Sequence, residues 1–246
     1  MDTKTKRVSD KLSSRLLAVC RMAEYRRNAA DIGCDHGYVS IYLAENNLAD
    51  RVFAMDVNNG PLLRAKENIE AYGCGERIET RLSDGLSGLS LYEADYAVIA
   101  GMGGKLIESI IRNSHAIAEK MDYLIISPHS DLPHVRTFLA ENGYEIIDED
   151  IVLEDDKFYQ IMKISFRGVK IALTKAEIIY GPVLLKKKSD ILGKRIEKDR
   201  VSYEKVLSDL RGMGNGDLFA ERQEEILDFL NTNKEAWRLL YGENRD

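Results

Sequence analysis

Two aspartates alternate with two glycines in the run "DIGCDHG", and this spacing suggests a loop that holds a small charged ligand. Asp31, Gly33, Asp35 and Gly37 form the pattern D-x-G-x-D-x-G. Dinucleotide-binding loops instead follow G-x-G-x-x-G, because their backbone must approach an anionic pyrophosphate at a helix N-terminus. A carboxylate at the centre of the loop would repel that phosphate and attract a cation. The pattern therefore favours a positively charged ligand without phosphate groups.

The loop is a variant of the D/E-x-G-x-G-x-G loop of S-adenosylmethionine-dependent methyltransferases. The amino group and the sulfonium of S-adenosylmethionine are both cationic, so Asp31 and Asp35 suit this cofactor electrostatically. We therefore predict that Asp31, Gly33, Asp35 and Gly37 bind S-adenosylmethionine. The alternative is a plain strand-to-helix turn in which Asp35 only caps the helix. Whether Asp35 binds the cofactor or stabilises a methylated product is left open.

Two further acidic positions suggest a nucleoside. Asp56 ends the apolar run "RVFAMD", where a carboxylate can accept hydrogen bonds from both ribose hydroxyls, and Val57 follows it. In "RLSDGL", Asp84 with Gly85 could receive the adenine amino group, although Asp-Gly is also a common turn. We predict that these four residues complete the cofactor site.

The elements that must position these residues alternate between strand and helix. Short apolar stretches at 28–33, 51–57, 77–84, 96–101 and 123–128 predict strands, and helices are expected to start near Val39, Pro61, Gly104 and Pro133. A first helix is predicted at 9–23, and 144–166 reads as an antiparallel hairpin around the acidic turn "EDDK". Three acids that follow successive parallel strands meet at one edge of the sheet, the expected ligand edge.

The acceptor side is predicted from the loops after the fourth and fifth strands. In "IAGMGG", Gly101 allows close backbone approach and is assigned to the cofactor, while Met102 offers an apolar contact to a planar base. We expect Met102, His36, Tyr38 and His129 to line the catalytic pocket. For His129 the alternative is a loop histidine without a function.

From about residue 169 the strand signal ends and apolar residues recur seven apart. This spacing predicts a helical hairpin or short coiled coil, and the run "GMGNGD" is expected to form the turn between its arms. The series are Leu185 and Leu192; Ile196, Tyr203 and Leu210; and Leu230 and Trp237.

Composition excludes several classes of protein. The 246 residues are 44% hydrophobic and 31% charged, with no long apolar stretch near the start, so we expect a cytoplasmic protein without a membrane segment. Cys20, Cys34 and Cys74 are widely spaced and form no C-x-x-C pair, so neither a disulfide framework nor a metal site is expected. Net charge is −6, yet residues 1–30 carry eight Lys/Arg against three acids. A polyanion could dock at this basic end.

Several motifs together resemble the bacterial TrmK family, tRNA adenine-N1 methyltransferases that act on adenine 22. The matching runs are "LSSRLLAVCRMA", "DIGCDHGYVSIYL", "AMDVNNGPLLRAKENI", "RLSDGL", "IAGMGG", "FYQI" and "EIIYGPVLL". The resemblance implies an α/β fold: a Rossmann-like class I methyltransferase sheet of seven strands with an antiparallel last hairpin (1–167), and a C-terminal coiled-coil-like helical domain that helps to hold tRNA (168–246). Family members tend to have Q-P-N after strand five, whereas this chain has Ser127-Pro128-His129, so a substrate contact is expected to differ.

The implied reaction needs alignment more than proton transfer. Adenine N1 has a free lone pair at neutral pH and can attack the sulfonium methyl group without a general base. Because N1 lies on the Watson–Crick edge, the adenosine must be unpaired or flipped. Two alternatives remain: a methyltransferase with another acceptor, and a non-catalytic RNA-binding protein on the same fold. The sequence indicates no oligomeric state and no particular set of tRNAs.

Overall fold

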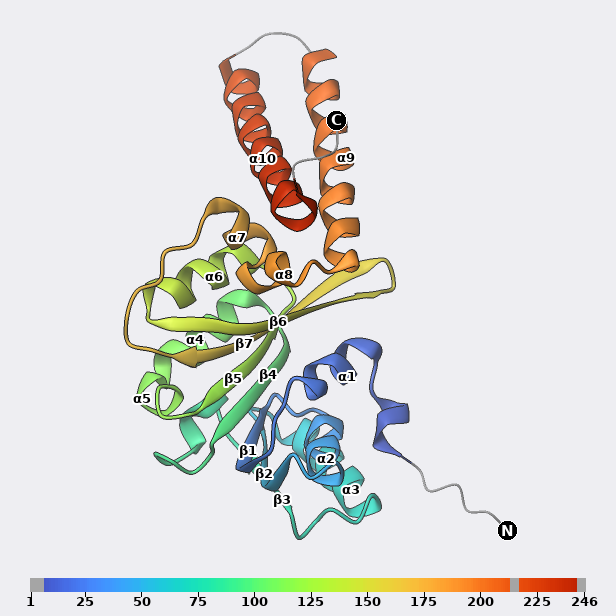
Figure 1. Ribbon diagram of the computed structural model, residues 1–246. Helices are drawn as coiled ribbons and strands as arrows, with labels where there is room; N and C mark the ends of the chain where they lie inside the picture. The colour runs from blue at the N-terminus through green and yellow to red at the C-terminus, as the bar shows by residue number, and fades with distance from the viewer. Residues whose placement is uncertain (1–6, 213–216, 243–246) are drawn as a thin grey trace, which may run out of the picture. The chain divides into compact units, whose positions relative to one another are not determined.

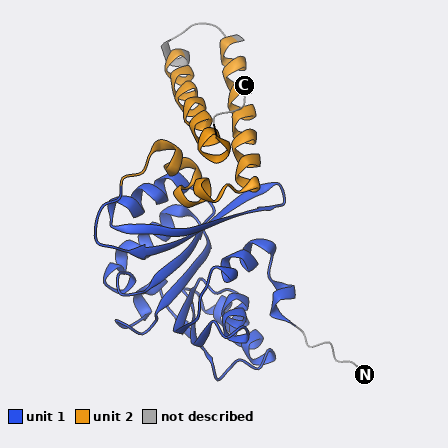
Figure 2. Ribbon diagram, in the orientation of Figure 1, with its two compact units in different colours: residues 1–171 blue, residues 172–246 orange. Residues whose placement is uncertain are grey.

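The computed structural model describes residues 7–212 and 217–242. The chain divides into two compact units, Met1–Ile171 and Ala172–Asp246 (Figure 2). The first unit contains the sheet and the second contains only helices among its described residues. The predicted α/β fold with a helical C-terminal part is confirmed.

The first unit is built on one seven-stranded sheet with the order β3-β2-β1-β4-β5-β7-β6 (Figure 1). The neighbours from β3 to β5 are parallel, whereas β7 is antiparallel to both β5 and β6. Both the predicted strand number and the antiparallel last hairpin are confirmed. The strands are β1 (Arg26–Ile32), β2 (Ala49–Asp56), β3 (Ile78–Leu82), β4 (Tyr96–Met102), β5 (Tyr123–Pro128), β6 (Tyr144–Glu154) and β7 (Lys157–Phe166).

Helices cover both faces of this sheet, which explains why the central strands are almost wholly apolar. All six residues of β5 are buried, for example. On one face lie α1 (Ser14–Arg21), α2 (Tyr38–Glu45) and α3 (Asn59–Ala71); on the other lie α4 (Gly104–Asn113), α5 (His115–Ala118) and α6 (Leu132–Glu141) (Figure 1). A short 3₁₀ turn, η2 (Gly85–Gly88), follows β3.

The N-terminal segment differs from the single helix predicted at 9–23. A 3₁₀ turn, η1 (Val8–Lys11), comes first, and α1 begins only at Ser14. The reason is Ser13, whose extended backbone interrupts the helix and whose side chain accepts a hydrogen bond from the Leu16 N–H. Serine at this position satisfies a backbone donor that the first helical turn leaves unpaired.

The β6–β7 hairpin turns at Asp155 and Asp156, both with positive φ (48° and 58°). A two-residue turn of this hand matches the twist of the flanking strands, and aspartate tolerates it better than most residues. The acidic turn that the sequence predicted is therefore confirmed.

The second unit contains α7 (Lys175–Tyr180), α8 (Pro182–Lys187), α9 (Asp190–Gly212) and α10 (Asp217–Tyr241). The long helices α9 and α10 form the expected hairpin, with the rings of Tyr203 and Phe229 stacked at 3.9 Å. The Leu185–Leu192 pair does not belong to one helix, because Lys188 adopts a left-handed conformation that ends α8. Four of the residues of the predicted turn, 213–216, lie outside the described residues. In the described chain, every helix is too short or too polar to cross a membrane.

Candidate active site

A pocket of about 290 Å³ lies at the carboxyl ends of β1, β2 and β4 and in the loop after β3. This edge is where ligands bind in open α/β sheets. Six of the nine predicted cofactor residues line the pocket, together with one of the four predicted catalytic residues. The lining residues are Ile32, Gly33, Asp56, Val57, Asn58, Ser83, Asp84, Gly85, Ala100, Gly101, Met102, Leu106 and Ile110.

The two pocket aspartates keep acceptor capacity. One oxygen of Asp56, Oδ1, accepts the backbone N–H of Asn58 at 2.8 Å, which fixes the carboxylate at the end of β2. The exposed carboxylate of Asp84 accepts no hydrogen bond from the described residues. An ionised carboxylate has about four acceptor positions, so both groups can receive hydroxyl or amino donors from a ligand.

Gly33 makes room for Met102. Its φ is +74°, and a Cβ atom at this position would lie 2.3 Å from Cε of Met102. Any larger residue would be strained and would push the methionine side chain aside. The end of β1 and the end of β4 therefore approach each other closely on one side of the pocket.

Two exposed apolar side chains belong to the pocket wall. Val57 is 58% exposed and Leu106 is 51% exposed, although both are hydrophobic. Apolar side chains beside acceptor oxygens are what a planar, hydrogen-bonding base requires. Sequence reasoning included Val57 but missed Leu106, as well as Ile32, Asn58, Ser83, Ala100 and Ile110. A usable signal was an apolar residue in the first turn of the helix after "GMGG".

Asp31 lies behind the pocket and does not line it. Its side chain is buried, at 4% exposure, and Oδ2 accepts both the N–H (3.1 Å) and the hydroxyl (2.6 Å) of Ser40. Burial raises the pKa of Asp31 to about 6, the Ser40 bonds oppose this shift, and the Asp56 charge adds to it. Asp31 thus ties the end of β1 to the first turn of α2.

Asp35 and its neighbours contact α3 rather than the pocket. The carboxylate of Asp35 accepts a 2.7 Å bond from Arg64, and Nε2 of His36 lies 3.6 Å from it. The rings of His36 and Tyr38 stack with centroids 5.5 Å apart. Gly37, at φ +72°, is itself the residue before α2, with no side-chain cap. Asp35 therefore neither caps α2 nor lines the pocket.

The backbone of His129 is hydrogen-bonded to a residue that lines the pocket. Its N–H donates to the carbonyl of Met102 at 2.9 Å. The imidazole Nε2 contacts Nη1 of Arg15, and the ring lies edge-on to Tyr159 with centroids 5.6 Å apart. Burial, and then the Arg15 charge, lower the pKa of His129. Arg15 and Tyr159 fall within "LSSRLL" and "FYQI", but nothing in their spacing indicated that they would meet His129.

Acceptor oxygens, apolar walls and glycine-lined backbone together suit a nucleoside with a positively charged group. The matches with known proteins agree. The model of TrmK, tRNA (adenine(22)-N(1))-methyltransferase, matches residues 29–235. The tRNA (adenine(22)-N(1))-methyltransferase of Bacillus subtilis strain 168 is 31% identical over 236 residues, 92% of this chain and 97% of that protein.

Two solved structures are similar over nearly the whole chain. Sp1610 of Streptococcus pneumoniae, in complex with S-adenosyl-L-methionine, has a TM-score of 0.80 and 28% identity, over 92% of this chain and 99% of that one. TrmK of M. capricolum, in complex with S-adenosyl-homocysteine, has a TM-score of 0.79 and 28% identity, over 93% and 99%. The chain that carries this pocket therefore belongs to the TrmK family of tRNA (adenine(22)-N(1))-methyltransferases.

Proposed function

We propose that this protein transfers a methyl group from S-adenosylmethionine to N1 of adenine 22 in tRNA, in the cytoplasm. The observation that carries the proposal is the pocket at the ligand edge of the sheet, where Asp56 and Asp84 offer free acceptor oxygens beside apolar walls. Membership in the TrmK family supplies the acceptor. Similar proteins solved with S-adenosylmethionine and S-adenosyl-homocysteine support the cofactor.

The pocket residues divide into three tasks in this proposal. Asp56 accepts the ribose hydroxyls, and Asp84, beside Gly85, accepts the adenine amino group. Val57 and Leu106 provide apolar surface for the adenine ring. Gly33 and Gly101 bring the backbone close to the methionine part of the cofactor.

The remaining loop residues act on the cofactor indirectly. Asp31 fixes the start of α2 through Ser40, whereas Asp35 fixes the loop to α3 through Arg64. Gly37 packs against Ala65 at a place where a Cβ would lie 3.2 Å from the Ala65 Cβ. These contacts hold the turn in the conformation in which Gly33 reaches the pocket.

The residues expected near the acceptor base are Met102, His129, His36 and Tyr38. Bound S-adenosylmethionine supplies the electrophilic methyl group; adenine N1 supplies the electron pair, so the chain needs no general base. Met102 lies between the pocket and the His129 backbone, where it can align the base with the methyl group. The lowered pKa of His129 favours the neutral imidazole, which avoids repelling the cationic product base.

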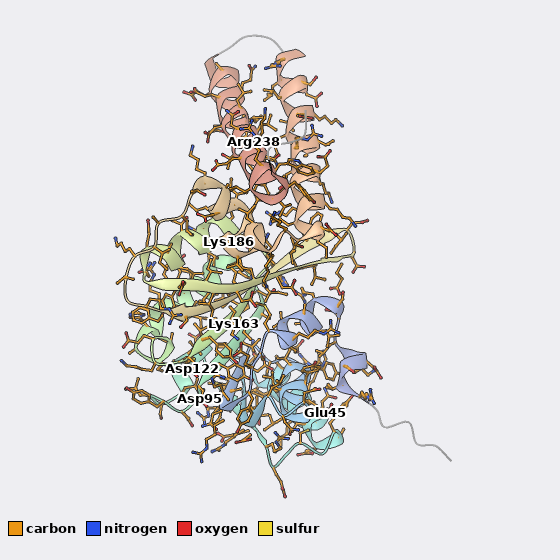
Figure 3. The ribbon with its side chains drawn as sticks, in the orientation of Figure 1. Glu45, Asp95, Asp122, Lys163, Lys186 and Arg238 are labelled. Carbon is orange, nitrogen blue, oxygen red and sulfur yellow. The ribbon has the colours of Figure 1, made fainter. Side chains whose placement is uncertain are left out.

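The helical second unit is proposed to help hold the tRNA. Lys186, Lys187 and Lys188 are exposed at the end of α8, with Lys186 labelled in Figure 3. Contacts between such lysines and phosphates would weaken as salt concentration rises. The proposed catalytic part is 1–167 and the proposed tRNA-holding part is 168–246, a division close to that of the two compact units.

The direct test is methylation of tRNA by the purified protein, followed by mapping of the modified base with mass spectrometry. A transcript with guanine in place of adenine 22 is the matched control. Methylation lost only in that control supports the proposal. Methylation elsewhere, or of another acceptor, would favour a different methyltransferase, and a protein that fails to bind S-adenosylmethionine at millimolar concentration would favour a non-catalytic RNA-binding role.

A further inference from the structure

The guanidinium of Arg15 forms no ion pair within the described chain. Other arginines of the first unit do: Arg26 pairs with Asp122, Arg64 with Asp35, and the buried Arg136 with Glu149. Glu154 lies near Arg15, but its Oε1 is used by the Ser14 hydroxyl and by the Arg15 backbone N–H. The Arg15 guanidinium, at the first turn of α1, therefore has no carboxylate within ion-pair distance among the described residues.

Two aromatic rings hold this guanidinium in place. Nη1 contacts Nε2 of His129, and Cζ lies 4.9 Å from the centre of the Tyr159 ring. Nε is buried and has no hydrogen-bond partner. A guanidinium has five N–H donors, and a buried donor without a partner is unfavourable by an amount comparable to a lost hydrogen bond. The Arg15 side chain is thus fixed in position, but its buried Nε–H donor has no hydrogen-bond partner.

A chain of contacts connects Arg15 to the proposed cofactor pocket. Arg15 contacts His129, whose backbone N–H is bonded to the carbonyl of Met102, and the Met102 side chain lines the pocket. His129 itself is exposed, whereas Arg15 and Tyr159 are half-buried, so the cluster of these three residues is partly open to solvent.

The positive charge of Arg15 indicates whether it faces the base or the phosphate of the acceptor nucleotide. A fixed cation that faced the base would oppose the positive charge that develops on adenine during methylation. A cation that faces a phosphate is neutralised instead, and a guanidinium matches phosphate oxygens with two parallel hydrogen bonds. A nucleotide flipped out of its stack also needs a new anchor for its backbone.

We propose that Arg15, held by His129 and Tyr159, binds the phosphate next to the acceptor adenosine and so sets the position of the base at the pocket. This inference rests on the proposed function. Arg15 is then a substrate-binding residue, whereas Tyr159 is a positioning residue that acts through it.

The first experiment compares Arg15→Ala with Arg21→Ala, a matched removal of a basic, exposed side chain from the other end of α1. For Arg15→Ala we expect kcat/KM for tRNA to fall about 10- to 100-fold, the range for a hydrogen bond to a charged group. Affinity for S-adenosylmethionine, measured by calorimetry, should be unchanged. Arg21→Ala should stay within about twofold of the parent protein in both measurements, as expected for a surface change. Equal losses in the two variants would overturn the inference.

The second experiment removes the partner instead of the arginine. Transfer RNA is assembled by ligation with a neutral methylphosphonate on one side or the other of adenosine 22. One of the two should lower kcat/KM for the parent protein about as much as Arg15→Ala does, and should cause no further loss in Arg15→Ala, because the pair is coupled. If the two losses multiply for both methylphosphonates, Arg15 does not bind either phosphate.

Arg15→Lys and thermal unfolding separate binding from folding. Lysine keeps the charge but not the planar fork, so part of the activity should return at an unchanged melting temperature. If Arg15→Ala does not fold, the methylphosphonate series with the parent protein and Arg15→Lys still decides the matter. Absence of methylation at adenine 22 by the parent protein would refute the proposed function; normal methylation without coupling would refute only the role of Arg15.

Discussion

Aspartates occur at both edges of the sheet, but their carboxylates are used differently. At the amino-terminal edge, just before β4 and β5, Oδ2 of Asp95 accepts the backbone N–H of Asn28 at 2.7 Å, and Oδ2 of Asp122 accepts Nε of Arg26 (Figure 3). At the carboxyl edge, Asp56 accepts one short-range bond and Asp84 accepts none from the described residues. The first pair holds strands and loops together, whereas the second pair keeps free acceptor oxygens, which we propose bind the cofactor.

The comparison shows that position at the ligand edge is not sufficient for a binding role. Asp31 also lies at the carboxyl end of a strand, yet the two donors of Ser40 occupy its Oδ2 and its side chain is buried. The place of an aspartate in a motif therefore says less about its role than its hydrogen bonds do. A carboxylate that already accepts bonds from the protein is expected to be structural, whereas one with free acceptor positions can bind a ligand.

The largest expected effect concerns the buried Asp31. Its pKa is about 6 in the folded protein against an ordinary value of 3.8, so the folded state keeps a proton that the unfolded chain loses in this range. Stability must therefore fall as pH rises from about 4 to about 6, by about 3 kcal/mol, and then level off. Urea unfolding of the parent protein and Asp31→Asn across pH 4–7.5 measures the difference. Parallel curves for the two proteins would mean that Asp31 ionises normally.

Asp56→Ala should come next. We expect affinity for S-adenosylmethionine to fall about 30- to 100-fold, because two hydrogen bonds to a charged acceptor are lost, while the free energy of unfolding changes by less than about 0.5 kcal/mol. Calorimetry and urea unfolding check the two parts. An Asp56→Ala protein with normal cofactor affinity would place Asp56 with the structural aspartates.

Asp95→Ala tests the other side of the comparison. It leaves the backbone N–H of Asn28 without its acceptor, so the free energy of unfolding should fall by about 1–2 kcal/mol. Cofactor affinity should not change. Asp95→Asn, which keeps an acceptor oxygen, is the control and should retain most of the stability. A loss of cofactor affinity in Asp95→Ala would break the distinction between the two edges.

Asp84→Ala should have the smallest effect. The carboxylate is exposed, and a bond to the adenine amino group there competes with water, so we expect about a tenfold loss of affinity for S-adenosylmethionine and no loss of stability. Competition with S-adenosyl-homocysteine, measured in parallel for Asp56→Ala, ranks the two residues. A greater loss for Asp84→Ala than for Asp56→Ala would reverse the assignment of ribose and adenine acceptors.

Much of the site could be predicted because many of its residues lie at or just after the ends of strands. Gly33 and Asp56 come at the ends of apolar runs and Asp84 follows a short strand, and parallel strands bring such positions to one edge. The partner of Asp35 could not be predicted in this way, because Arg64 lies 29 residues later on α3 and only the packing of that helix brings it near.

The same reason explains the other differences. The contact of Arg15 with His129 spans 114 residues and depends on how α1 packs against the sheet. The break at Ser13 depends on a local competition between a side-chain cap and a longer helix, which apolar spacing does not reveal.

The bond between the Ser14 hydroxyl and Glu154, 140 residues apart, has a consequence for biosynthesis. Helix α1 is made well before Glu154 and the buried Lys163, which pairs with Glu24 (Figure 3). Domains form as units during synthesis, so the N-terminal helix must wait for the last hairpin of its unit. A nascent chain that stops before β7 would carry the residues that line the pocket but neither Tyr159 nor Lys163.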